Sequence, residues 1–274
     1  MRATRNGGSR SLALLGALLL LYLVVPIGYF LFTLSWRDVP AQLSDPIAIQ
    51  ALITSLLSAS LATAIIALLG VPLGYVLARR NFPGRGLLTL LVYLPLVFPP
   101  LVGGILLLIL YGPYGPIGAP FANAGLELDS SFAGIVLSQI FVASPFVIIA
   151  ALSAFEAVDP ALEQVAATLG KGSWEIFWRV NLPVARTSII AGLLLGWLRA
   201  LGEFGATVVM AYHPYTLPVY LYVQLSGTGV SAALPLALLM LGVSLIGVGL
   251  ALFLQSANRR RKTRQDERAT PYVS

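Results

Sequence analysis

Residues 156–183 read EAVDPALEQVAATLGKGSWEIFWRVNLP, a polar stretch between two long apolar runs. Apolar side chains recur in its first half at intervals of three and four residues, which places them on one face of a helix. They are Leu162, Val165, Ala166 and Leu169. Asp159 and Pro160 favour the start of this helix, and Gly170 favours its end because glycine readily takes the left-handed terminal conformation. A short helix is therefore predicted here, outside the membrane and between two spans.

The chain on both sides of this stretch consists of apolar runs long enough to cross a bilayer, which takes about 20 residues. Six spans are predicted, at 11–34, 49–78, 87–111, 132–155, 187–210 and 232–254. Of the 274 residues, 58% are hydrophobic and 10% are charged, against about a quarter charged in an ordinary soluble domain. The first span is too long for the core of a cleaved signal peptide, so we interpret it as a retained helix. The predicted fold class is an all-α, polytopic membrane protein of about six transmembrane helices.

The basic residues indicate the topology of these spans. All but two of the 17 Lys and Arg residues lie at the two ends or in loops on the same side as the ends, and the exceptions are Arg37 and Arg199. Because cytoplasmic loops retain Lys and Arg, we expect a multi-pass cell-membrane protein with both termini in the cytoplasm. The net charge of +6 is spread over short loops rather than gathered on one face, which argues against nucleic acid as a partner.

This topology divides the chain into three parts. Residues 1–48 hold an N-terminal tail, the first span and an outer loop. Residues 49–254 form the transmembrane domain, which includes the polar loop 156–183. Residues 255–274 form a basic cytoplasmic tail.

The polar loop resembles the EAA loop of ABC importer permeases, with a Glu and an Ala pair, a following Gly and a Leu-Pro ending. Gln164 and Val165 depart from that pattern, because an alanine pair is usual there. The resemblance implies a type I ABC importer transmembrane domain whose short helix is a coupling helix held in a groove of a separate cytoplasmic ATPase. The ATPase-coupling residues that it implies are Glu163, Ala166, Ala167, Leu169, Gly170, Leu182 and Pro183. The alternative is an amphipathic helix resting on lipid, although such helices usually carry Lys or Arg on the polar face and this one has none.

A second resemblance lies in the fifth span, where residues 199–207 read RALGEFGAT. This sequence is similar to the molybdate, tungstate and sulfate branch of the importer permeases, and it implies a tetrahedral oxyanion as the substrate. Molybdate or tungstate is the first expectation, and sulfate or thiosulfate is the alternative. Arg199 and Glu203 are four residues apart, so they can pair within the membrane, where an isolated ion is costly. Either they line a gate of the translocation path with Phe204 and Gly205, or they only lock the packing of helices.

Two further patterns concern the shape of the bundle. Pro95, Pro99 and Pro100 remove backbone donors inside the third span, which predicts a kinked helix that lines the path or a passive kink. Small residues recur at every fourth position of the fifth span, at Gly192, Gly196 and Ala200. Such a stripe lets another helix approach closely, either across a dimer or path interface or within one chain.

The sequence lacks the motifs that would make the chain an enzyme. It has no GxxxxGK[ST] phosphate loop, so ATP must be used by a partner chain, and we expect no cofactor or metal bound by this one. The expected partners are an ATPase dimer in the cytoplasm, an extracytoplasmic substrate-binding protein, membrane lipid, and a second copy in a homodimer or a sister permease. An ion-driven secondary transporter is the rival class, but it would need ionisable sites in both halves of the chain.

Overall fold

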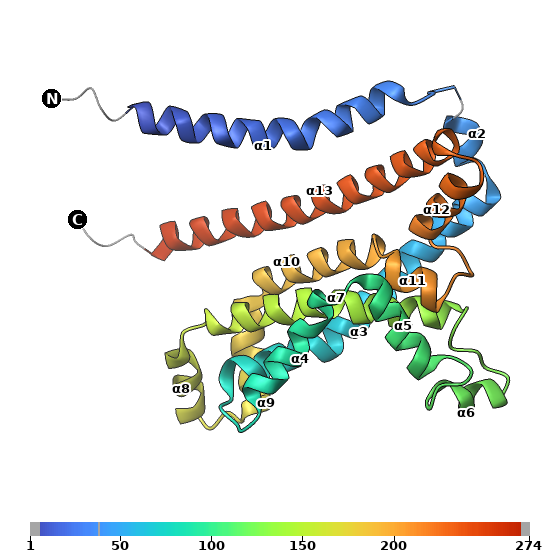
Figure 1. Cartoon of the computed structure of the whole chain (residues 1–274). Coiled ribbons are helices and arrows are strands. Elements are labelled where there is room, and N and C mark those ends of the chain that lie inside the picture. The colour runs from blue at the N-terminus through green and yellow to red at the C-terminus, as the bar shows by residue number, and fades with distance from the viewer. Residues whose placement is uncertain (1–5, 38, 270–274) are drawn as a thin grey trace.

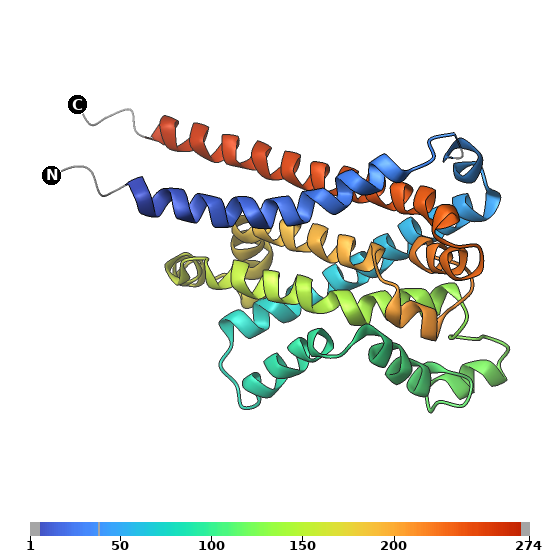
Figure 2. The ribbon, with the colours of Figure 1, turned by 45° about the horizontal axis from the view of Figure 1, so that its top comes forward.

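A computed structural model of the chain describes residues 6–37 and 39–269, with side chains described at 12–37, 39–250, 252 and 253. Every regular element in these residues is a helix, and the long helices run in roughly one direction (Figures 1 and 2). Within these residues five helical segments are long and apolar enough to cross a membrane, and the number is six when one bent pair is counted as a single span. The predicted fold class is therefore confirmed.

Three helices form the centre of the bundle, namely α3 (Pro46–Arg79), α7 (Phe132–Glu156) and α10 (Leu182–Leu201). Small residues let these helices approach closely. A methyl group added at Gly192 would collide with Ala150 of α7, and one added at Gly196 would collide with Val147 of the same helix. The stripe of small residues therefore serves packing within the chain, which decides between the two interpretations of its pattern.

The third predicted span is broken rather than kinked. Helix α4 (Arg85–Val97) and helix α5 (Pro100–Tyr111) are bent by 113° at Phe98 and Pro99. Proline lacks an N–H group and pushes the residue before it into an extended conformation, as found at Phe98 with ψ of 134°. The two helices diverge as the arms of a V whose apex points into the bundle (Figure 2).

The fifth predicted span, 187–210, starts earlier than expected and is interrupted before its predicted end. Helix begins earlier, at α9 (Ser173–Ile176), passes through a π-helical turn (Phe177–Asn181), and continues as α10. In the π turn the Leu182 N–H donates to the Phe177 carbonyl, five residues back. Helix α10 ends at Leu201, and the chain restarts as the short α11 (Gly205–Met210). The predicted span is therefore broken two thirds of the way along.

The remaining helices lie around this centre. Helix α1 (Asn6–Thr33) stands apart from the bundle, and its apolar segment Leu12–Thr33 contains no buried residue. Helix α13 (Val230–Ala269) extends well beyond its apolar segment. The beginning of α1 and the far end of α13 lie at the same end of the molecule as α8 (Pro160–Thr168), as Figure 1 shows. At the opposite end lie α2 (Val39–Leu43), α6 (Gly118–Asn123) and α12 (Leu217–Gly227).

Candidate functional site

The two broken spans meet at one place inside the bundle. Helices α5 and α11 pack backbone against backbone, because a methyl group on Gly104 would lie 2.8 Å from the Ala206 carbonyl oxygen. One on Gly205 would lie 2.8 Å from the Pro100 Cβ. A cavity of about 360 Å³ opens between the two breaks. It is lined by Pro99, Pro100, Leu101, Arg199, Gly202, Glu203, Phe204 and Gly205.

The sequence-predicted pair of Arg199 and Glu203 lies in this cavity. The Arg199 Nη1 is 2.6 Å from the Glu203 Oε2, so the predicted ion pair is present. Its geometry differs from a pair on one continuous helix, because Arg199 occupies the last turn of α10 and Glu203 follows the end of that helix. The other carboxylate oxygen of Glu203, Oε1, accepts a hydrogen bond of 2.7 Å from the Ala206 N–H in the first turn of α11.

The two members of the pair differ sharply in burial. The Glu203 side chain is 1% exposed, whereas that of Arg199 is 27% exposed. In the part of the chain whose side chains are described, the guanidinium makes no further hydrogen bond to protein, so several of its five N–H donors are open to the cavity. The carboxylate is therefore fixed, and the arginine is the accessible member.

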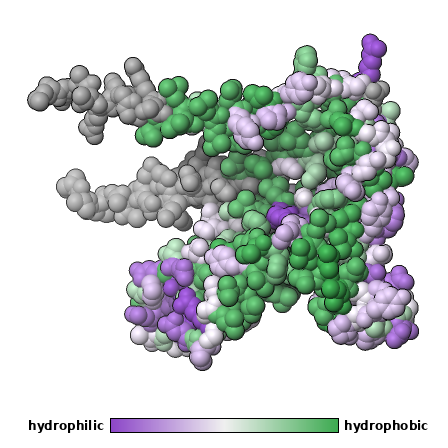
Figure 3. Space-filling view, in the orientation of Figure 1, coloured by the Kyte–Doolittle hydropathy of each residue, from purple (hydrophilic) through white to green (hydrophobic). Residues whose placement is uncertain are grey.

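Apolar surface surrounds this polar site. Figure 3 shows a hydrophobic band with polar ends, hollowed by a V-shaped notch between the arms α4 and α5, with a hydrophilic spot near its apex. Leu101 and Val97 near the break are exposed, as are Leu90, Leu94 and Ile105 along the two arms. Apart from Glu203, the arginine in this cavity is surrounded mostly by apolar residues, and this low local polarity strengthens its attraction for an anion.

The polar loop forms the short helix that its sequence predicts. The Asp159 side chain accepts a hydrogen bond of 2.9 Å from the Ala161 N–H, and Pro160 begins α8. Gly170 follows the end of α8 with φ of +79°, the left-handed conformation expected of it. Leu182 and Pro183 then open α10, with Leu182 packed against the core and Pro183 exposed.

Most of the apolar stripe of α8 faces away from the rest of the chain. Ala166 is buried, but Leu162, Val165 and Leu169 are exposed, and so is Trp174 in α9. Ala167 is exposed on the same short helix. The stripe is therefore a free apolar surface, since a helix that used it for packing within the chain would bury it.

Glu163 is turned toward the bundle instead. Its Oε1 lies 2.6 Å from the Nε of Arg79, the last residue of α3, and the two side chains are 22% and 12% exposed. The Arg79 Nη2 also donates to the Val158 carbonyl, which precedes α8. Arg79 thus ties both the start and the middle of the loop to α3. The sequence did not predict this role, because Arg79 was there only one of the basic residues that indicate the topology.

An aromatic cluster fixes the other end of the loop. Phe177, in the π turn, packs against Tyr75 of α3 and Phe155 of α7, with ring centroids 4.9 and 5.9 Å apart. Phe155 and Phe177 are buried in the main core. The loop is consequently held at both ends, against α3 at its start and against α3 and α7 at its end.

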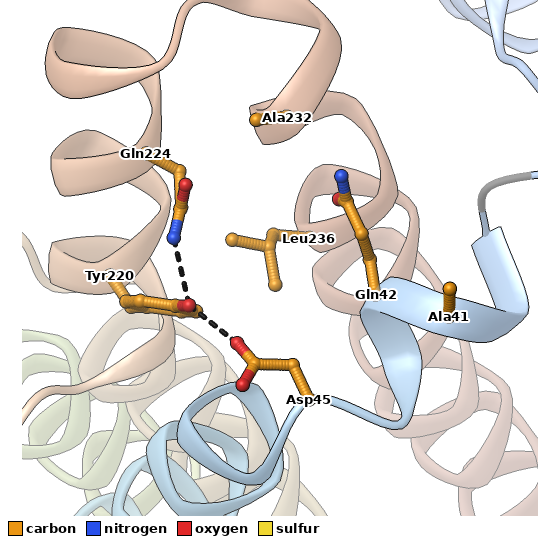
Figure 4. A pocket seen from close by; sticks show the side chains of 7 residues that line it. All are labelled: Ala41, Gln42, Asp45, Tyr220, Gln224, Ala232 and Leu236. Atoms are coloured by element: carbon orange, nitrogen blue, oxygen red, sulfur yellow. Dashed lines mark hydrogen bonds between the residues drawn. The ribbon is translucent and has the colours of Figure 1, made fainter.

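A second polar pocket, of about 250 Å³, lies at the opposite end of the molecule (Figure 4). There Tyr220 donates a hydrogen bond to Asp45, and the Gln224 Nε2 donates one of 2.8 Å to the Tyr220 hydroxyl. Burial and the neighbouring Asp45 raise the pKa of Tyr220, which keeps this hydroxyl a donor. Because its ionisable lining is a carboxylate and a neutral tyrosine, the pocket does not suit an anion.

Broken spans that meet around an accessible arginine, and an exposed helical loop at one end, are typical of the membrane-embedded subunit of a transporter. A family model described as "Binding-protein-dependent transport system inner membrane component" matches residues 70–262. The chain belongs to this family and is a permease subunit of an ABC importer, a transport component rather than an enzyme.

Relatives from several organisms match most of the chain. The molybdate/tungstate transport system permease protein WtpB of Thermococcus kodakarensis is 43% identical over 237 residues, which cover 85% of this chain and 90% of the relative. A probable molybdenum ABC transporter permease protein of Haloferax volcanii is 42% identical over 231 residues, 84% of each chain.

The fold is that of a solved bacterial ABC transporter that imports the acidic polysaccharide alginate. The TM-score is 0.71 with 20% sequence identity, over 93% of this chain and 96% of that one. At this identity the likeness concerns the fold alone. It accounts for the arrangement of helices, not for the residues of the cavity.

Proposed function

We propose that this chain forms the transmembrane path for a tetrahedral oxyanion, molybdate or tungstate, in an importer driven by a separate ATPase. The observation that carries the proposal is Arg199, an accessible cation at the meeting point of two broken spans. The names of the relatives from Thermococcus kodakarensis and Haloferax volcanii support the choice of substrate. A guanidinium suits such a substrate because its planar fork of donors matches two oxygens of an oxyanion.

The gate of the path lies at the cavity, with Arg199, Glu203, Phe204 and Gly205 as its residues. Phe204 packs against Tyr222 of α12 with ring centroids 5.0 Å apart and the rings tilted, so movement at the break would also move α12 at the outer end. Gly205 lets α11 approach α5 closely. A shift of either half-helix therefore changes the width of the cavity, which is what a gate requires.

Energy enters through α8, which acts as the coupling helix. Its exposed Leu162, Val165 and Leu169 offer an apolar surface of the kind that fits a groove on a partner protein. The helix has small side chains at Ala166 and Ala167 and ends before Gly170. It is joined to α10, which begins with Leu182 and Pro183. Glu163 serves the same function from inside, because its ion pair with Arg79 transmits force from α8 to α3.

The complete importer contains further chains. Two copies of this chain in a homodimer, or one copy with a sister permease, would enclose the path. The unburied apolar helix α1 and the notch between α4 and α5 supply the apolar surface for that contact and for lipid. An ATPase dimer binds the end that carries α8, in the cytoplasm with both termini, and a substrate-binding protein docks at the opposite end.

Reconstitution tests this proposal directly. The permease, its ATPase and its binding protein are assembled in lipid vesicles, and accumulation of molybdate, tungstate and sulfate is measured with and without ATP. We expect ATP-dependent accumulation of molybdate or tungstate, with sulfate as the alternative dianion. Accumulation by the permease without any ATPase would indicate an ion-driven transporter instead. Calorimetric preference of the binding protein for a sugar or an amino acid would contradict the oxyanion.

A further inference from the structure

Glu203 occupies the place where an anionic substrate would bind Arg199. Its Oε2 lies 2.6 Å from the Arg199 Nη1, closer than most charge-assisted hydrogen bonds. Arg199 itself lines the cavity, and among the described residues its guanidinium makes no hydrogen bond to any other protein group. The chain thus carries its own carboxylate at the site where the proposed function requires a dianion.

The carboxylate has an anchor that does not depend on the arginine. The Ala206 N–H donates to the Glu203 Oε1 at 2.7 Å, and the Glu203 side chain is 1% exposed. Glu203 can therefore keep its position when Arg199 turns away. Arg199 has no comparable anchor among the described residues, and its side chain is 27% exposed.

From this asymmetry we propose, on the basis of the proposed function, that Arg199 exchanges partners during transport. In the empty state it pairs with Glu203, and when a tetrahedral dianion enters the cavity it leaves the carboxylate and binds two oxygens of the substrate. No covalent bond changes in this step. The dianion gains two charge-assisted hydrogen bonds, and Glu203 retains the Ala206 N–H.

The exchange explains how the site releases what it admits. A free guanidinium in an apolar notch would hold a dianion tightly and slow its exit. Glu203 lies close by, repels the dianion and competes for the same cation, so the site binds the dianion only weakly. Glu203 is thus a positioning residue for Arg199 and an ejector for the substrate, not a ligand of it.

The test uses the Glu203→Gln variant, which keeps an oxygen for the Ala206 N–H but removes the negative charge. Retention of radiolabelled molybdate by the purified permease and ATPase complex, without the binding protein, is measured by equilibrium dialysis. We expect about tenfold tighter retention than in the wild type, because a like charge beside the substrate is gone. The rate of ATP-driven uptake should fall at the same time, because release becomes slow.

A matched control tests whether loss of any paired carboxylate has the same effect. Glu175 also pairs with an arginine four residues away, since its Oε1 lies 3.0 Å from the Arg179 Nη1, and it pairs with Lys171 at 2.7 Å as well. These residues are at the surface and do not line the cavity. Glu175→Gln should retain molybdate as the wild type does. Equal retention by Glu203→Gln and the wild type would overturn the exchange.

A measurement on the wild-type complex covers the case in which Glu203→Gln does not assemble. Molybdate should raise the thermal unfolding temperature of the complex, and perchlorate, a tetrahedral monoanion, should raise it less at equal ionic strength. Equal effects of the two anions would overturn the exchange. Wild-type vesicles that accumulate none of the three dianions would instead remove the proposed function itself. Accumulation with unchanged retention in Glu203→Gln would remove the exchange alone.

Discussion

Two ion pairs of this protein have the same chemistry and opposite construction. Arg79 and Glu163 come from distant parts of the chain, and both are largely buried at the end that carries α8. Arg199 and Glu203 are four residues apart, and only the carboxylate is buried. The first arginine is tied further by a hydrogen bond to the Val158 carbonyl, whereas the second has open donors. The comparison teaches that an ion pair clamps when both partners are anchored and is free to exchange when one is not.

The largest expected effect is at the exchangeable pair. Arg199→Ala should reduce ATP-driven oxyanion uptake by about 100-fold, because a bidentate charge-assisted contact is lost and Glu203 is left unpaired in the path. Uptake into vesicles measures this, and size-exclusion chromatography shows whether the complex still assembles. Normal uptake would show that the pair only braces the helices.

The Arg79–Glu163 pair, which we call the clamp, should respond differently to loss of its arginine. Arg79→Ala should leave ATP hydrolysis in place but reduce transport per ATP by about tenfold, because α8 would move without drawing α3 with it. Hydrolysis and uptake are measured on the same vesicles. Arg85→Ala is the control, since its pair with Glu156 is longer, at 3.6 Å, and more exposed. If both variants lose coupling equally, charge at this end matters and the clamp does not.

The contact between the two broken spans gives a smaller, structural effect. Gly104→Ala should destabilise the permease by about 1–3 kcal/mol, because its methyl group meets the Ala206 backbone and the Val209 side chain within 2.9 Å. Gly242→Ala is the matched control, because nothing lies within 4 Å of a methyl group there. Thermal unfolding in detergent measures both. Equal unfolding temperatures would mean that α5 and α11 separate easily, and the cavity would then lack a fixed wall.

The smallest effect is expected in the Asp45 pocket. Tyr220→Phe should cost about 1 kcal/mol of stability through the lost hydrogen bond, with uptake changed less than about twofold. The raised pKa of Tyr220 means that this bond contributes fully at neutral pH and is lost only as pH rises through the raised value. Thermal unfolding temperatures of the wild type and of Tyr220→Phe between pH 7 and pH 11 measure whether the stability difference falls as pH rises. A large loss of uptake would place this pocket on the substrate path.

Sequence spacing predicts the exchangeable pair and misses the clamp for a physical reason. Residues four apart on a helix lie on one face, so the spacing of Arg199 and Glu203 predicts a pair. The pair is present although α10 ends at Leu201, because Glu203 follows directly in the break before α11. Arg79 and Glu163 are far apart in the chain and meet only because the fold brings the end of α3 against α8. The spacing of the α8 stripe predicts the helix correctly, but not that Leu162, Val165 and Leu169 are left exposed.

The sequence by itself determined that most of the chain lies in a membrane, where most of its helices lie, and which family the chain resembles. Apolar length fixes which segments can enter a bilayer, and local signals such as Asp159, Pro160 and Gly170 fix where a helix starts and ends. Only the tertiary structure decided that the spans break at Pro99 and Gly202 beside one another, and which arginine is anchored and which is free. Those features depend on contacts between distant segments, which residue spacing along the chain does not encode.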